Sequence, residues 1–209
     1  MYLAYKINDI QPGDIVLCQK FSPPSVPQTL LSMGAMPVFI NSETGSWNVS
    51  TSSLEQSIGK CINGEIKLKG KAKSKSILPK AIVVGHNYGM PASMEKIKEI
   101  AIHHNIALIE NAHDGFGATW HKQSVGTFGD TGIYGFNENN IITAKGGAAL
   151  VVKNKDKTAI AKRLLNESNL IDPALSDRKG KDVFFMDLHQ AAFGRAQLKQ
   201  IKKRIRKKR

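Results

Sequence analysis

The chain has 209 residues, of which 41% are hydrophobic and 22% charged, with a formal net charge of +13 at pH 7. This composition excludes disordered, collagen-like and membrane-spanning chains, and it suffices for the core of one globular domain. Lys6, Asn8 and Asp9 interrupt the N-terminal segment where a signal peptide needs an unbroken apolar run, so we expect a soluble, cytoplasmic protein. Cys18 and Cys61 lack metal or redox spacing and are expected to be reduced thiols.

Short apolar runs alternate along the chain with helix-length amphipathic segments, a pattern typical of a mainly parallel α/β sheet. The apolar runs predict strands over residues 15–18, 37–40, 81–84, 106–109, 132–136 and 149–152. The amphipathic segments predict helices over residues 26–33, 54–58, about 92–104, 155–165 and 187–209. Residues 166–182 are polar and contain Pro173 and Gly180, so we expect a loop there. The expected fold class is α/β, with a sheet flanked by helices in a three-layer αβα arrangement.

Polar side chains follow three of the predicted strands. They lie in His86 to Gly89, Glu110 to Asp114, and Asn137 to Asn140. Because ligands of open α/β sheets bind at the carboxyl ends of the strands, we expect these segments to form the functional site. His86 and Tyr88 either line a ligand pocket or satisfy backbone groups at a strand end. No spacing of His, Cys, Asp or Glu residues indicates a metal site, and we expect none.

Six segments together resemble one known family. In chain order they read QPGDIVLCQ, MGAMPVFIN, HNYGMPASM, IENAHDGFG, GTFGDTGIYGFNENNIITAKGG and AAFGRAQL. Their order and spacing are similar to those of the DegT/StrS sugar aminotransferases, which belong to the fold-type I enzymes that use pyridoxal phosphate (PLP). The resemblance implies a PLP-transferase-like large domain, with PLP as cofactor and a nucleotide sugar as substrate. It also implies transfer of an amino group from glutamate to a keto-sugar nucleotide, in polysaccharide biosynthesis.

The resemblance covers the central part of the family's large domain. A Ser-Gly-Thr loop that holds the cofactor phosphate lies further upstream in the family, and a small C-terminal domain follows the last helix. We therefore expect residues 1–209 to form a single, partial large domain, truncated at both ends. Because family active sites lie at a dimer interface, we expect a homodimer, or a heterodimer with an intact aminotransferase.

The two positions of greatest chemical importance carry asparagine. The family's Schiff-base lysine falls on Asn140, whose amide forms no imine. The aspartate that keeps the pyridinium nitrogen protonated falls on Asn111, which carries no charge. Lys145, five residues after Asn140, is the alternative source of an amine. Relatives with histidine at the lysine position catalyse dehydration, and asparagine offers no base for that chemistry either.

Three further cofactor positions are altered. By resemblance, the aromatic residue that stacks on the PLP ring falls on Pro23, and the serine that binds its phosphate falls on Gly135. The polar residue near the cofactor hydroxyl falls on Asp114. With His86, Tyr88 and Asn111, these are the expected positions of a degenerate PLP site that does not bind PLP covalently. The sequence thus predicts an inactive chain, with an active transaminase or a non-catalytic partner of an intact paralogue as alternatives.

The excess positive charge is concentrated at the C-terminus. Nine lysines or arginines and no acidic residue lie between Arg195 and Arg209, which leaves a net charge of +4 for the rest of the chain. We interpret this part of the basic terminal helix as a solvated helix end. The alternative is salt-dependent binding of nucleic acid or acidic lipid, but no aromatic residues interleave the charges to stack on bases. We expect neither a nucleic-acid nor a membrane partner.

Overall fold

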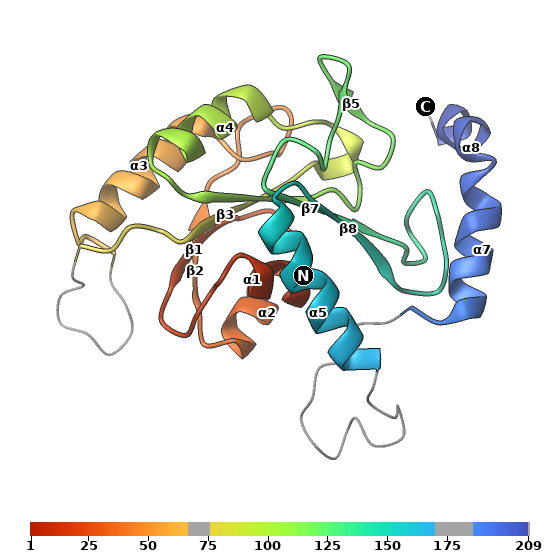
Figure 1. Cartoon of the computed structure of the whole chain (residues 1–209). Coiled ribbons are helices and arrows are strands. Elements are labelled where there is room, and N and C mark those ends of the chain that lie inside the picture. Colours follow the sequence, from red (N-terminus) through yellow and green to blue (C-terminus); the bar gives the residue numbers. More distant parts are fainter. Residues whose placement is uncertain (67–75, 170–185, 209) are drawn as a thin grey trace.

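A computed structural model describes residues 1–66, 76–169 and 186–208 and has a six-stranded sheet at its centre (Figure 1). The strands, in their order across the sheet, are β2 (Met36–Ile40), β1 (Ile15–Gln19), β3 (Ala81–Gly85), β4 (Ala107–Asn111), β7 (Thr131–Gly135) and β8 (Ala148–Val152). Neighbouring strands from β2 to β7 are parallel, and β8 is antiparallel to β7. All six predicted strands are present, with bounds that differ by one or two residues.

Helices cover both faces of the sheet (Figure 1). One face packs against α3 (Thr51–Ile62) and α4 (Met94–His103), and the other against α1 (Tyr2–Ile7), α2 (Ser25–Ser32) and α5 (Lys155–Asn169). The central strands are buried on both sides, because alternate residues of a strand point to opposite faces. In β1, Leu17 belongs to the core under α3 and α4, whereas Val16 belongs to the core under α1 and α2. The three-layer αβα fold is confirmed.

Three elements differ from the sequence prediction. Helix α3 begins after Ser50, whose side chain accepts a hydrogen bond from the Ser53 backbone N–H, and it is longer than residues 54–58. Helix α1 was not predicted, nor was the hairpin of β5 (Thr119–Trp120) and β6 (Gln123–Ser124). The two residues at the tip of this hairpin, His121 and Lys122, have φ values of 46° and 67°, a conformation usually signalled by Asn-Gly.

The prediction of one helix over residues 187–209 is wrong. The structure has two helices, α7 (Leu188–Leu198) and α8 (Ile201–Lys208), which stand beside the β8 edge (Figure 1). Asp187 and Gln190 begin α7 with a capping box. The buried Gln197 side chain accepts from the Thr143 N–H at 3.0 Å and donates to the Thr143 carbonyl at 2.5 Å, which fixes the end of α7.

The polar loop predicted over residues 166–182 is wrong at residues 166–169, because helix α5 continues to Asn169. Residues 170–182 lie outside the described residues. Within the part of the chain that the structure describes, no helix is both long and apolar enough to cross a membrane.

Candidate functional site

The expected strand-end segments come together at the carboxyl edge of the parallel strands, around a cavity of about 460 Å³. Its walls come from the segments after β3, β4 and β7 and from α8. They comprise Tyr88, Gly89, His113, Asp114, Phe116, Gly117, Ala118, Asn139, Asn140, Ile141 and Ile205. A second cavity of about 300 Å³ shares Tyr88 and Asp114 with the first and extends to Lys20 and Pro23. Thus Tyr88, Asp114 and Asn140 line the main cavity, whereas His86, Asn111 and Gly135 line neither of the two.

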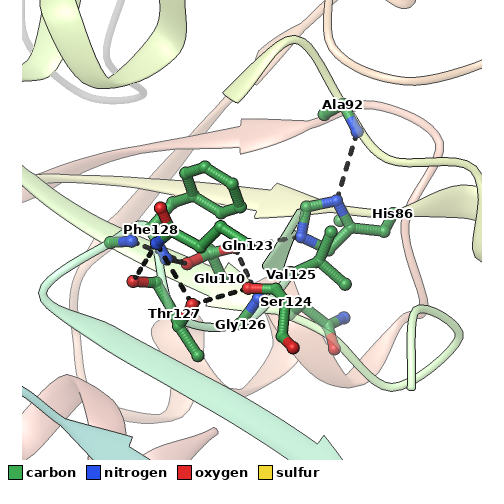
Figure 2. A network of polar contacts seen from close by, with 12 residues as sticks. His86, Ala92, Glu110, Gln123, Ser124, Val125, Gly126, Thr127 and Phe128 are labelled. Atoms are coloured by element: carbon green, nitrogen blue, oxygen red, sulfur yellow. Dashed lines mark hydrogen bonds and ion pairs between the residues drawn. The ribbon is translucent and has the colours of Figure 1, made fainter. Parts of the chain in front are cut away.

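Glu110, the last residue but one of β4, is the centre of a fully buried polar network (Figure 2). One carboxylate oxygen, Oε1, accepts hydrogen bonds from the backbone N–H groups of Phe128 and Gly129, both at 2.6 Å. The other, Oε2, accepts from the Gly126 N–H at 2.7 Å and lies 3.2 Å from Nε2 of His86. Burial raises the pKa of Glu110, but the bonds from His86, Gly129 and Gly126 outweigh this effect and hold the pKa below its usual value.

The second nitrogen of His86 defines which tautomer is present. Nδ1 accepts a hydrogen bond from the Ala92 backbone N–H at 3.2 Å (Figure 2). Because Nδ1 is an acceptor, the ring proton is on Nε2 and is donated to Glu110. Both partners in this pair are buried, so His86 ties the segment after β3 to the end of β4 and is not open to a ligand. Of the two roles considered for His86, backbone satisfaction describes its Nδ1 contact with Ala92, whereas the Nε2 contact with the Glu110 side chain belongs to neither.

Tyr88 stands in an exposed group of three aromatic rings. Its ring centroid lies 6.1 Å from that of Phe21, which lies 5.6 Å from that of Trp47. Trp47 and Tyr88 have φ values of 60° and 55°, which is unusual for large side chains. Two buried asparagines, Asn48 and Asn87, stabilise this backbone by hydrogen bonds.

The two asparagines bond mainly to the main chain. Asn87 Nδ2 donates to the Trp47 and Phe21 carbonyls at 2.7 and 3.2 Å. Asn48 accepts from the Asn87 N–H and donates to the Met90 carbonyl, both at 2.9 Å. These bonds join the loops after β1, β2 and β3. Sequence reasoning missed Asn48, and it placed Glu110 in an expected site segment without predicting its structural role. The signal for that role was a lone acid at the end of an apolar strand.

Asn140 and Asn111, which the resemblance aligns with the Schiff-base lysine and the pyridinium aspartate, both form hydrogen bonds within the chain. Asn140 lines the main cavity and donates from Nδ2 to the Gly135 carbonyl at 2.7 Å. Asn111 is buried, and its Oδ1 accepts a weak bond from the His113 N–H at 3.5 Å. Lys145 is exposed and its carbonyl accepts from Gln190 of α7, so it lies on the outside and does not line the cavity. Among the described residues, no three His, Cys, Asp or Glu side chains are grouped to hold a metal ion.

The sheet order, the antiparallel edge strand β8 and the strand-end cavity define a PLP-transferase-like large domain. A solved DegT/DnrJ/EryC1/StrS aminotransferase from Brucella abortus matches 97% of the chain, at 21% identity and a TM-score of 0.80. The model of the DegT/DnrJ/EryC1/StrS aminotransferase family matches residues 1–209. The chain therefore belongs to this family.

Curated relatives agree with the family match. A putative pyridoxal phosphate-dependent aminotransferase, EpsN of Bacillus subtilis, is 32% identical over 100% of the chain. GDP-perosamine synthase of Escherichia coli O157:H7 is 31% identical over 74% of the chain. The chain covers 51% of the first relative's length and 38% of the second's.

Proposed function

We propose that this chain keeps the large-domain framework of a nucleotide-sugar aminotransferase but forms no PLP imine, and hence catalyses no transamination by itself. The observation that carries the proposal is Asn140. By resemblance, Asn140 falls on the position of the Schiff-base lysine, and its amide donates to the Gly135 carbonyl. An amide nitrogen has no free electron pair to attack an aldehyde, so the first covalent step of this chemistry has no nucleophile at Asn140.

The second requirement, a protonated cofactor nitrogen, is not met by Asn111. Its side chain is neutral, and its partner is the backbone N–H of His113. Replacing a carboxylate by an amide removes a charge-assisted hydrogen bond worth roughly 1.5–3 kcal/mol. PLP acts as an electron sink only while that nitrogen stays protonated.

The main cavity also suits a phosphate poorly. Among the residues that line it there is no lysine or arginine, and its charged side chain is the Asp114 carboxylate. A carboxylate repels a phosphate. The residues of this chain therefore do not fit a covalently held PLP, and we derive no reaction step through it.

The second candidate is a non-catalytic partner of an intact family member. The exposed aromatic group of Phe21, Trp47 and Tyr88 favours it, because exposed aromatic clusters are typical of protein interfaces. The conventional function, amino transfer to a nucleotide sugar, follows from relatives such as GDP-perosamine synthase and requires an amine from another lysine. We place all of these functions in the cytoplasm, since both cysteines are free and buried.

Borohydride trapping tests the proposal directly. The chain is incubated with PLP, reduced, digested and mapped by mass spectrometry, with absorbance near the imine band recorded beforehand. We expect no saturable imine and only scattered labelling of exposed lysines. Lys20, at the edge of the second cavity, and Lys145 are the two sites to quantify, with Lys20→Gln and Lys145→Gln as matched variants. A single lysine labelled stoichiometrically at micromolar PLP would overturn the proposal.

A further inference from the structure

Gly135, the last residue of β7, is buried beside the ring of His113. A Cβ built on Gly135 would lie less than 3.0 Å from Cδ2 and Nε2 of that imidazole and 3.1 Å from its Cγ. Real Cβ atoms essentially never approach other heavy atoms closer than 3.0 Å. The Gly135 backbone does not have the positive φ that would itself require glycine. The neighbouring ring, not the backbone conformation, therefore occupies the space that a side chain at position 135 would need.

Among the described residues, the ring of His113 is held by its packing against Gly135 and not by a hydrogen bond at Nδ1. Nδ1 of His113 is buried and, within the described part of the chain, has no hydrogen-bond partner. Burial lowers the pKa of His113 and outweighs the opposite effect of the Asp114 carboxylate, which favours the neutral ring. An unpaired buried nitrogen is unfavourable, and the close packing against Gly135 has to offset it. The same ring lines the main cavity, whereas Gly135 does not.

We propose that His113 and Gly135 are a compensating pair, in which the imidazole occupies the space of a side chain at position 135 and closes this strand end to a phosphate group. The inference rests on the proposed function and adds to it. By resemblance, position 135 supplies the serine that binds the cofactor phosphate. A serine is accommodated here only when residue 113 is small, so restoring Asn140→Lys and Asn111→Asp leaves the site closed.

A double-mutant cycle on thermal stability tests the pair. Gly135→Ser is made in the natural chain and in the His113→Ala background. In the natural chain we expect it to lower Tm by about 3–10 °C, as overpacking does in a chain of this size. In the His113→Ala background we expect a loss of less than about 2 °C. If Gly135→Ser alone does not fold, recovery of soluble protein in the double variant supports the pair, and failure of both contradicts it.

Gly132→Ala is the matched control on the same strand. Its Cβ would collide with the Gly126 carbonyl, which is backbone that His113→Ala cannot relieve. We therefore expect the same loss in both backgrounds. An equal loss for Gly135→Ser in both backgrounds, or a Tm within 1 °C of the natural chain, would overturn the proposal.

A second measurement concerns the phosphate. The variant Asn111→Asp/Asn140→Lys is compared with one that also carries His113→Ala/Gly135→Ser, by borohydride labelling at position 140. We expect at least tenfold more labelling in the second, and equal labelling contradicts the closure of the site. An imine on the natural chain contradicts the proposed function alone, while the stability cycle still decides whether residues 113 and 135 are coupled.

Discussion

Replacing Glu110 with glutamine removes one charge from the most densely bonded side chain of the site. The carboxylate is fully buried and has four donors around its two oxygens (Figure 2). Glutamine offers one oxygen and one NH₂ group in the same volume. If the oxygen stays with Phe128 and Gly129, the NH₂ group faces the N–H of Gly126 and Nε2–H of His86. The NH₂ group and these two N–H groups are all hydrogen-bond donors, so none of them has an acceptor.

A change of the His86 tautomer does not provide acceptors for all of these donors. His86 can accept from the new NH₂ group only by moving its proton to Nδ1, which then faces the Ala92 N–H. In either tautomer at least two buried donors lack an acceptor. Each costs about 1–3 kcal/mol, so Glu110→Gln should destabilise the fold by roughly 2–6 kcal/mol. That is a large part of the 5–15 kcal/mol typical of a domain and lowers Tm by about 4–24 °C.

Urea unfolding followed by circular dichroism measures the effect. The matched control is Glu99→Gln, at an exposed position of α4, for which we expect a change within about 0.5 kcal/mol. The slope of the transition should be the same for both variants, because the area exposed on unfolding is unchanged. A loss of less than 1 kcal/mol for Glu110→Gln would refute the view that four donors depend on this carboxylate.

Three further predictions concern the same framework. The folded state holds the pKa of Glu110 below its ordinary value of about 4.3, so its contribution is complete above that pH and is lost as the pH falls through the folded pKa. Unfolding at pH 3–7 should show the Glu110→Gln and natural chains converging towards the acid end, and a constant difference would contradict this. Asn48→Ala removes two buried bonds and should cost about 2–3 kcal/mol in urea unfolding, with increased hydrogen exchange around Asn87. Gln197→Ala should increase hydrogen exchange in α7 and α8, whereas the exposed Gln200→Ala should not, and equal exchange in both would show that Gln197 does not hold α7.

The centre of the sheet was predictable because strands such as β1 and β3 are buried on both faces. Ile82 and Val84 face one core and Ala81 and Val83 the other, so the sequence of β3 is an unbroken apolar run. Such runs are the clearest strand signal in a parallel sheet. The strand-end positions followed from the order of the strands, and Tyr88, Asp114 and Asn140 do meet at one cavity.

Other features depend on contacts between distant segments. The break between α7 and α8 follows from Gln197 bonding to Thr143, a residue 54 positions earlier, and no local signal marks it. The turn at His121 and Lys122 adopts positive φ without glycine or asparagine. The position of His86 after a strand left open whether it binds a ligand or satisfies backbone groups, and only the contacts with Glu110 and Ala92 show that both its nitrogens are engaged.

At this site, the residue that stabilises the fold is different from the residues that the resemblance aligns with the family's chemistry. Glu110 and Asn111 are adjacent, yet the first has four donors that tie together β3, β4 and the loop before β7, and the second has one weak bond. A lysine in place of Asn140 would put a cation against the cavity wall, whereas the asparagine amide is paired within its own loop. The contacts that hold this strand end therefore belong to Glu110 and not to Asn111 or Asn140. Under the proposed function, asparagine at positions 111 and 140 leaves no buried charge unpaired, so we expect the chain to fold without PLP.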